Sequence, residues 1–107
     1  MLLDRIKELR EEYVDRTDLL SVQLVKQIDF IFHTLRVGTV SQVTDEQVNK
    51  AIYNASLAHK YNVQYMRERM DDVNNIVPIV DNYTATSAAM ALLESRVYQY
   101  FALQQVA

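Results

Sequence analysis

The scarcity of turn-forming residues is the feature of this chain that most restricts its fold. Glycine and proline occur once each in 107 residues, at Gly38 and Pro78. Tight hairpin turns usually need glycine, and strands are usually bounded by glycine, proline and similar residues. So few of them argue against a sheet and favour a few long helices that end near these two positions. The sequence therefore predicts an all-α fold in a single domain over residues 1–107, a length that suits one domain.

Apolar residues in the first third of the chain recur at helical spacing. They step by three or four positions through Leu2, Ile6, Leu9, Tyr13, Leu20, Leu24, Ile28, Ile31 and Leu35. The helical spacing of the stripe continues through the stretch DRTDLLS if Thr17 occupies the stripe position between Tyr13 and Leu20. A break in the helix would usually shift this spacing. We therefore predict one helix over about residues 2–37, about 54 Å long. The alternative is a break near Thr17 and Asp18, with Thr17 as the N-cap of a second helix.

Two local signals separate this helix from the next. Gly38 suits a helix C-cap, because the capping residue needs a positive φ. The segment TDEQ at 44–47 matches a capping box. In that motif Thr44 accepts a hydrogen bond from the Gln47 amide, and the Gln47 side chain reaches back.

The remaining signals predict two more helices. Pro78 ends a helix by removing a donor and by restricting Val77, so the second helix should cover about residues 45–77. After a short connection, a third helix should cover about residues 84–106. A short loop between two long helices implies an antiparallel hairpin, and the third helix would pack on it. The expected architecture is therefore an elongated helical bundle.

Composition argues against several classes of function. A net charge of −3 does not provide the basic surface that nucleic-acid binding normally needs. The chain has no cysteine, so it has no disulfide and no thiolate chemistry. No apolar run is long enough to span a bilayer, and the start, MLLDRIKELREE, is charged from residue 4 and does not resemble a secretory signal. We therefore expect no nucleic-acid partner and no membrane span, and a location in the cytoplasm or within a particle.

No pattern of catalytic or cofactor-binding residues stands out. No glycine-rich loop is present to hold a phosphate, and spacing supports no Ser-His-Asp arrangement. Neither His33 nor His59 follows a glutamate by three residues, as ferritin-like metal sites require. Asp29 and His33 are four residues apart, a spacing at which two side chains on one helix can bind the same metal ion. Lys26 and Arg36 flank them on the same face, so we interpret the four residues as a polar stripe exposed to solvent. The prediction is no enzymatic activity, no cofactor and no bound metal.

Three polar residues fall on the apolar stripe of the second predicted helix: His59, Asn62 and Arg69. Polar groups in such places are costly unless they are bonded or paired. One interpretation is that His59 is a hydrogen-bonded core residue and that Arg69 extends to solvent near the helix end. The other is that the three set the register of the helices, within the hairpin or between subunits.

A second apolar stripe runs along the opposite face of the same helix. Tyr53, Leu57 and Tyr61 follow one another at intervals of four residues. Tyrosine is favoured at interfaces, because it is large and apolar with a polar tip. A similar group lies off the main stripe of the first helix: Leu19, Phe30 and Val37. We expect the tyrosine stripe to contact a partner, the alternative being that the third helix covers one of these groups.

The closing helix has two packing faces and little charge. Residues 86–107 carry two charges, Glu94 and Arg96. The bulky face consists of Met90, Leu93, Val97, Tyr100 and Phe101, and the small face of Thr84, Ala88, Ala91, Ser95 and Ala102. Small residues at heptad spacing allow two helix backbones to approach closely. The hairpin can cover only one of these two faces, and the pattern does not decide which. We expect a partner protein, most simply a second copy of this chain, to cover the remaining face.

These features lead to a functional hypothesis. We predict a non-enzymatic assembly subunit that associates through its C-terminal helix and its tyrosine stripe. A low-charge amphipathic helix at the end of the chain resembles the helical subunits of secretion rods and viral assemblies, which implies a role in a phage particle or secretion apparatus. The alternative is a small adaptor or chaperone that holds a helix of another protein. A bundle enzyme or ligand carrier would need a pocket that unites His59, Asn62 and Arg69.

Overall fold

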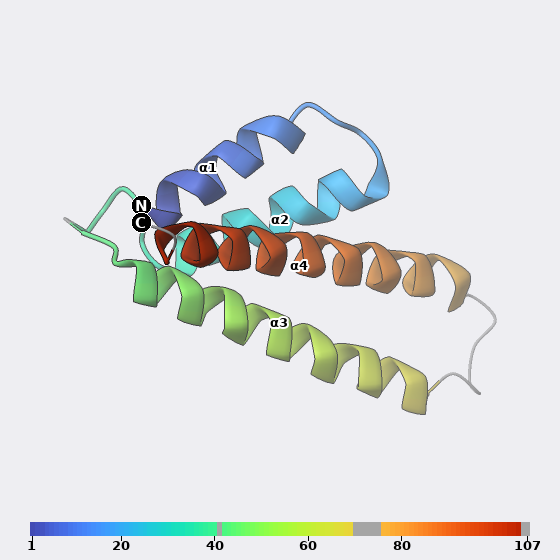
Figure 1. Cartoon of the computed structure of the whole chain (residues 1–107). Coiled ribbons are helices and arrows are strands. Elements are labelled where there is room, and N and C mark those ends of the chain that lie inside the picture. The colour runs from blue at the N-terminus through green and yellow to red at the C-terminus, as the bar shows by residue number, and fades with distance from the viewer. Residues whose placement is uncertain (41, 70–75, 106–107) are drawn as a thin grey trace.

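In the part of the chain that the structure describes, four helices surround a common apolar core (Figure 1). They are α1 (Leu2–Tyr13), α2 (Leu19–Thr34), α3 (Asp45–Glu68) and α4 (Ile76–Gln104). The computed structural model describes residues 1–40, 42–69 and 76–105, with the side chains of residues 76–79 left out. Within these residues there is no strand, so the all-α prediction is confirmed. The molecule measures 52 × 31 × 27 Å and is elongated, as expected.

The prediction of one continuous helix over residues 2–37 is wrong. The chain breaks after Tyr13, and α2 begins behind an N-cap at Asp18, with ψ at 154°, rather than at Thr17. The Asp18 carboxylate accepts from the Ser21 amide at 3.1 Å and from the Ser21 hydroxyl at 2.7 Å. Because of the break, α1 turns back along α2 (Figure 1), and Leu2, Ile6 and Leu9 enter the same core as the residues of α2. The burial of these three side chains favours two helices over one.

The boundary between the second and third predicted helices also differs. Helix α3 ends at Glu68, and the part of the predicted helix over residues 70–75 lies outside the described residues. Pro78 does not end α3 but stands at the third position of α4, which begins at Ile76 instead of residue 84. The first four amides of a helix have no intrahelical acceptor, so a proline there loses no hydrogen bond.

The turn after α2 is a Schellman motif built on an arginine rather than a glycine. Leu35 is the C-cap, and Arg36 takes a left-handed conformation with φ at 57°. The Val37 amide donates to the Phe32 carbonyl at 3.0 Å, and the Arg36 amide donates to the His33 carbonyl at 3.1 Å. Gly38, predicted as the C-cap, has a φ of 92° and lies two residues later in the loop.

The predicted capping box at the start of α3 is confirmed. Thr44 Oγ1 accepts from the Gln47 amide at 3.2 Å, and Gln47 Oε1 accepts from the Thr44 amide at 2.9 Å. This reciprocal pair fixes where the second half of the bundle begins.

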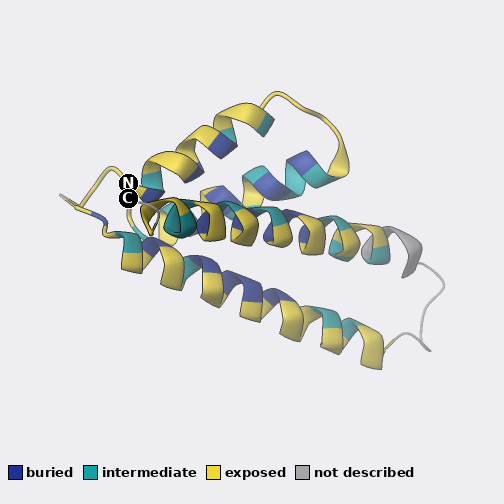
Figure 2. Ribbon diagram, viewed as in Figure 1, coloured by how far each residue is buried: buried dark blue, intermediate teal, exposed yellow. Residues whose placement is uncertain are grey.

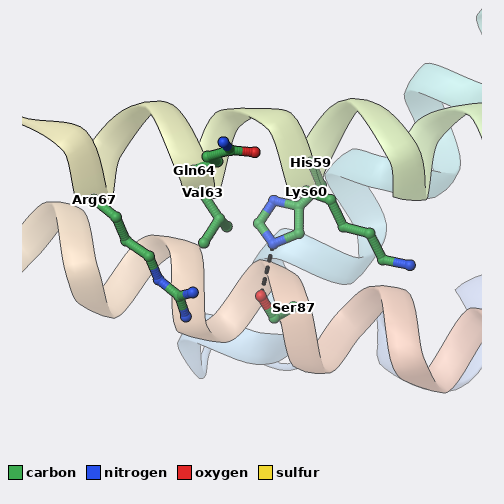
Figure 3. A pocket seen from close by; sticks show the side chains of 6 residues that line it. All are labelled: His59, Lys60, Val63, Gln64, Arg67 and Ser87. Atoms are coloured by element: carbon green, nitrogen blue, oxygen red, sulfur yellow. Dashed lines mark hydrogen bonds between the residues drawn. The ribbon is translucent and has the colours of Figure 1, made fainter.

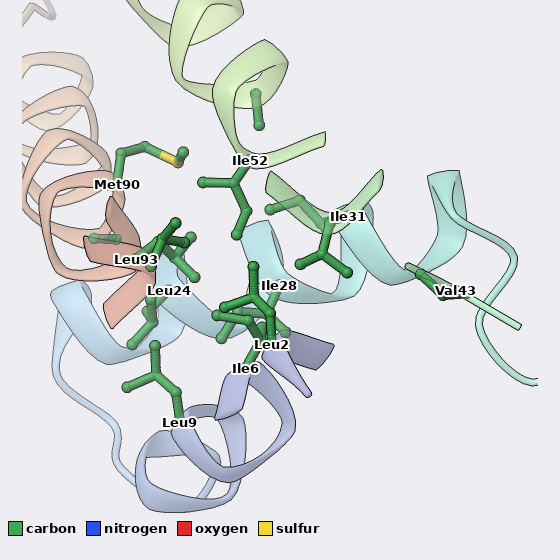
Figure 4. Packing of buried hydrophobic residues seen from close by; sticks show 14 residues of the cluster. Leu2, Ile6, Leu9, Leu24, Ile28, Ile31, Val43, Ile52, Met90 and Leu93 are labelled. Atoms are coloured by element: carbon green, nitrogen blue, oxygen red, sulfur yellow. The ribbon is translucent and has the colours of Figure 1, made fainter. Parts of the chain in front are cut away.

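Apolar residues from every helix form the core (Figure 2). The fully or almost fully buried side chains include Leu2, Ile6, Leu9, Leu24, Ile28, Ile31, Val48, Ile52 and Leu93. Leu24 of α2 and Leu93 of α4 lie close together in the cluster drawn in Figure 4. Burying one such side chain contributes roughly 1.5–3 kcal/mol.

The two left-handed residues after α2 should respond in opposite ways to substitution. A residue with a Cβ atom pays a steric cost in the left-handed conformation, and Arg36→Gly removes that cost. This substitution should raise the free energy of unfolding by about 0.5 kcal/mol. Gly38→Ala imposes that cost and should lower it by about 1 kcal/mol, although an added Cβ meets no atom within 4 Å. Urea denaturation of both variants measures the two effects. A destabilised Arg36→Gly would contradict this account of the turn.

Candidate functional site

The contact between α3 and α4 contains the only buried titratable side chain among the described residues, His59. Its Nε2 lies 2.7 Å from Ser87 Oγ of α4 (Figure 3). Burial lowers the pKa of His59 below 6.5, because the charged imidazolium would be poorly solvated. The imidazole is therefore neutral at pH 7, and the exposed Ser87 hydroxyl connects it to the surface.

A groove of about 400 Å³ runs over this pair. The residues that line it come mostly from α3: His59, Lys60, Val63, Gln64, Arg67 and Ser87. In Figure 3 Lys60 and Arg67 lie on either side of the His59–Ser87 hydrogen bond. The groove therefore combines two cations with a hydroxyl.

Of the three polar residues expected on the apolar stripe of α3, only His59 is buried. This agrees with the interpretation that His59 is a hydrogen-bonded core residue and that Arg69 extends to solvent near the helix end. Asn62 and Arg69 do not lie on the buried stripe. Both are exposed, since the core contact of α3 ends near His59. The guanidinium carbon of Arg69, the C-cap of α3, lies 3.7 Å from the centre of the Tyr65 ring, which is a cation–π contact at the end of the helix. His59 and Asn62 border a hollow between α2 and α3 together with Phe30.

The bulky face of α4 points into the bundle. Met90, Leu93 and Val97 are buried in the core, so their expected place in a partner interface is wrong. Tyr100 and Phe101 are half-buried against the core, with their rings in a T-shaped contact at 5.3 Å. The large side chains bury more apolar surface than the small ones, and the core receives them.

The small face of α4 points outward. Ala88, Ala91 and Ser95 are exposed, and so is Tyr98, which was not among the residues predicted for this face. The signal was present, because Tyr98 continues the alternating steps of four and three. We use the name outer seam for Thr84, Ala88, Ala91, Ser95, Tyr98 and Ala102.

The two charges near the end of α4 are engaged by neighbouring helices. Arg96 Nη1 lies 3.2 Å from Glu12 Oε2 of α1. On the other flank, Glu94 accepts a hydrogen bond from the Ser56 hydroxyl of α3. Both charges therefore lie at the sides of α4, and the outer seam between them is uncharged.

The tyrosine stripe of α3 is exposed, and so are Leu19 and Phe30 of the group predicted on the first helix, so the third predicted helix covers neither group. Tyr53 and Tyr61 have 64% and 65% of their surface exposed, and Leu57 has 38%. Tyr65, one further step of four residues along α3, extends the stripe with 57% exposed. Tyr53 also borders a hollow with Glu94 and Val97, which places this end of the stripe beside α4. The stripe is a surface available to a partner.

Asp45 connects three helices, which its sequence position did not reveal. Its Oδ1 accepts from the Leu2 amide at 2.9 Å and its Oδ2 accepts from the Tyr100 hydroxyl at 2.7 Å. The start of α1, the start of α3 and the end of α4 therefore meet at one carboxylate. The bonds from Tyr100 and Leu2 lower the pKa of Asp45 below 3.8, and the carboxylate raises the pKa of Tyr100 above 10.0.

Asp29 and His33 do not form a shared site in the structure. The Asp29 carboxylate pairs with Arg10 of α1 at 2.7 Å. Over residues 1–40, 42–69 and 76–105, no group of three or more possible metal-ligating side chains gathers. None of the helices in this part of the chain is both long enough and apolar enough to cross a membrane.

Comparison with known proteins gives no match: no family model, no curated protein and no solved structure resembles this chain. Its function is therefore inferred from its own surfaces.

Asp45→Asn should destabilise the fold in a pH-dependent way. The pKa of Asp45 is lower in the folded state, so its stabilisation is complete above about pH 4 and is lost as the pH falls through the folded value. At pH 7 the substitution should cost about 1 kcal/mol after allowance for solvent screening, and near pH 2 the difference should vanish. Urea denaturation at both pH values measures this.

The matched control is Glu46→Gln, which removes the same charge from the same helical turn without breaking a bond to another helix. If both variants lose the same free energy of unfolding at pH 7, the interaction of a negative charge with the helix dipole accounts for the loss, and the bonds of Asp45 to Leu2 and Tyr100 do not.

Proposed function

We propose that this protein is a non-enzymatic helical assembly subunit, which self-associates through the outer seam of α4 and the tyrosine stripe of α3. The observation that carries the proposal is the uncharged exposed seam of α4. Its two neighbouring charges, Glu94 and Arg96, are engaged within the same chain. An exposed, uncharged, heptad-spaced face is typical of a helix that packs against another helix.

The size of the seam side chains favours a helix as the partner. Alanine and serine let two helix backbones approach closely, whereas loops and flat surfaces gain little from such a face. From Thr84 to Ala102 the seam is about 27 Å long at 1.5 Å per residue. A second copy of α4 presents a face of the same size and character, which supports self-association.

The tyrosines provide the contact area that the small residues lack. A stable interface buries roughly 1,200–2,000 Å² in total, more than alanines along one helix supply. Tyr98 lies on the seam itself with 76% of its surface exposed, and Tyr53 lies beside α4. Large aromatic side chains dominate the binding energy of many interfaces. We therefore propose that Tyr98 anchors the contact through the seam, and that the tyrosine stripe of α3 anchors a second contact.

The biological setting that we propose is a larger complex, such as a phage particle or a secretion apparatus. The support is the presence of two separate exposed surfaces, on α3 and on α4. A subunit with two different contact surfaces can bind neighbours on two sides, as growth beyond a dimer requires.

A second candidate function, an adaptor that binds a helix of another protein, is supported by the hollow between α2 and α3. This hollow has a volume of about 280 Å³ and is bordered by Ala58 and by Phe30, which has 61% of its surface exposed. A partly exposed aromatic beside small residues suits an inserted apolar side chain. Light scattering on the purified chain separates the candidates, because an assembly subunit forms oligomers alone and an adaptor remains a monomer or dimer.

Ala91→Leu should dissociate the assembly without unfolding the subunit. The larger side chain forces two seams apart, at a typical overpacking cost of 1–3 kcal/mol. Because Ala91 is exposed, the stability of the isolated subunit should change by less than about 0.5 kcal/mol. Light scattering measures the mass, and circular dichroism measures the helical content. Ala58→Leu on α3 is the matched control and should leave the mass unchanged. An Ala91→Leu protein that keeps its full mass would exclude the seam as the contact.

The double variant Tyr53→Ala, Tyr61→Ala should weaken association more than folding. Both side chains are mostly exposed in the subunit, so their truncation removes little core contact. Sedimentation at several concentrations gives the association constant, and thermal unfolding at low concentration gives subunit stability. If the double variant unfolds easily but associates normally, the stripe has a structural role and not a binding role.

A further inference from the structure

We propose that the groove between α3 and α4 binds an organic phosphate monoester, with the phosphate between Lys60 and Arg67 and the organic group over the neighbouring apolar wall. The inference rests on the groove of about 400 Å³ and goes beyond the proposed assembly function. It uses a largely different surface: Lys60 and Arg67 do not belong to the outer seam, and the hollow beside the groove shares Thr84 with it.

The charge of the groove is opposite to that of the chain. The chain has a net charge of −3, yet among the described residues Lys60 and Arg67 are the charged residues that line the groove, and no carboxylate lines it. Glu68 lies beside the groove, where it accepts a hydrogen bond from the Gln64 side chain at 3.4 Å. Glu94, farther along α4, already accepts the Ser56 hydroxyl. Cations without a lining carboxylate form a local anion site, because their attraction for a ligand is not cancelled.

The His59–Ser87 pair adds a neutral donor between the two cations. When neutral His59 carries its proton on Nε2, it donates to Ser87 Oγ across the 2.7 Å contact. The Ser87 hydroxyl hydrogen is then free to point into the groove and to donate to an anion. A bound anion therefore selects this tautomer of His59.

The number and origin of the donors favour a phosphate over a carboxylate. Lys60 and Arg67 extend from α3 on either side of Ser87 of α4 (Figure 3). A phosphate monoester has three terminal oxygens, one for each donor group, whereas a carboxylate has two. In Figure 3 the Lys60 ammonium points away from Ser87, so its flexible side chain must turn toward the groove before the three donors can each contact a different phosphate oxygen.

The groove continues into an apolar hollow that suits the organic part of the ligand. This hollow, of about 200 Å³, shares Val63, Arg67 and Ser87 with the groove and adds Met66 and Tyr83 to its walls. The ring centres of Tyr83 and His59 are 6.0 Å apart. An aromatic or aliphatic group attached to the phosphate can therefore cover apolar side chains while the phosphate contacts the cations.

Titration with phenyl phosphate, followed by NMR, tests the inference. We expect saturable shifts of the amide signals of residues 59–67 and of Ser87, with the imidazole nitrogens of His59 moving to the Nε2-protonated tautomer. Inorganic phosphate should bind more weakly, because it lacks the organic group. Benzyl alcohol should cause no saturable shift, because it lacks the phosphate. Equal affinity for phenyl phosphate and inorganic phosphate would overturn the apolar part of the proposal.

Charge substitutions identify the groups that bind the phosphate. Lys60→Gln and Arg67→Gln should each weaken phenyl phosphate binding about tenfold or more. Lys50→Gln is the matched control, since it removes one positive charge from an exposed position of α3 outside the groove. No saturable binding, or an equal loss in all three variants, would overturn the proposal. Light scattering of the same variants keeps this result separate from the assembly function, because their oligomeric mass should not change.

Discussion

The apolar contact between α2 and α4 is the constraint on which the rest of the bundle depends. It is the most extensive contact between any two helices, and it brings Leu24 and Ile28 together with the bulky face of α4. Because α2 and α4 both contribute buried aliphatic side chains here, α1 and α3 need only one apolar stripe each to close the core. The break at Asp18 follows from this, since a continuous helix over residues 2–37 would carry Leu2 and Ile6 away from the core. The local cap at Asp18 and the burial of α1 favour the same arrangement.

The polar contacts between helices determine which surfaces remain uncharged. Arg96 with Glu12, and Arg10 with Asp29, are partly exposed pairs, and such pairs contribute roughly 0–1 kcal/mol each. Their main effect is to hold charged groups at the sides of the helices. On α4 this leaves the seam without charge. Where α4 faces α3, Ser87 of α4 lines the groove together with Lys60 and Arg67 of α3. Helix α4 thus takes part in two surfaces of different chemistry, an uncharged seam and a groove that two cations line.

The parts of the fold that were predictable depend on residues close together in the chain. The capping box at Thr44 needs only a spacing of three, and the structure confirms it. Periodicity over residues 2–37 was misleading, because two helices that pack on the same core can keep the same apolar phase by coincidence. Pro78 allows two interpretations, because a proline can end the helix before it or stand in the first turn of the helix after it. Packing between distant residues decides such cases, and a single sequence does not contain it.

The candidate sites show the same limit. His59 and Ser87 are 28 residues apart and Asp45 and Tyr100 are 55 apart, so no spacing rule connects them. The two faces of the closing helix could be recognised, but pattern alone did not decide which one is buried. Side-chain volume decides it: Met90, Leu93 and Val97 fill the space between the other helices, which Ala88, Ala91 and Ser95 would leave as a cavity at a cost in stability. The small face is therefore the outward one, and its low charge makes it suited to close contact with another helix.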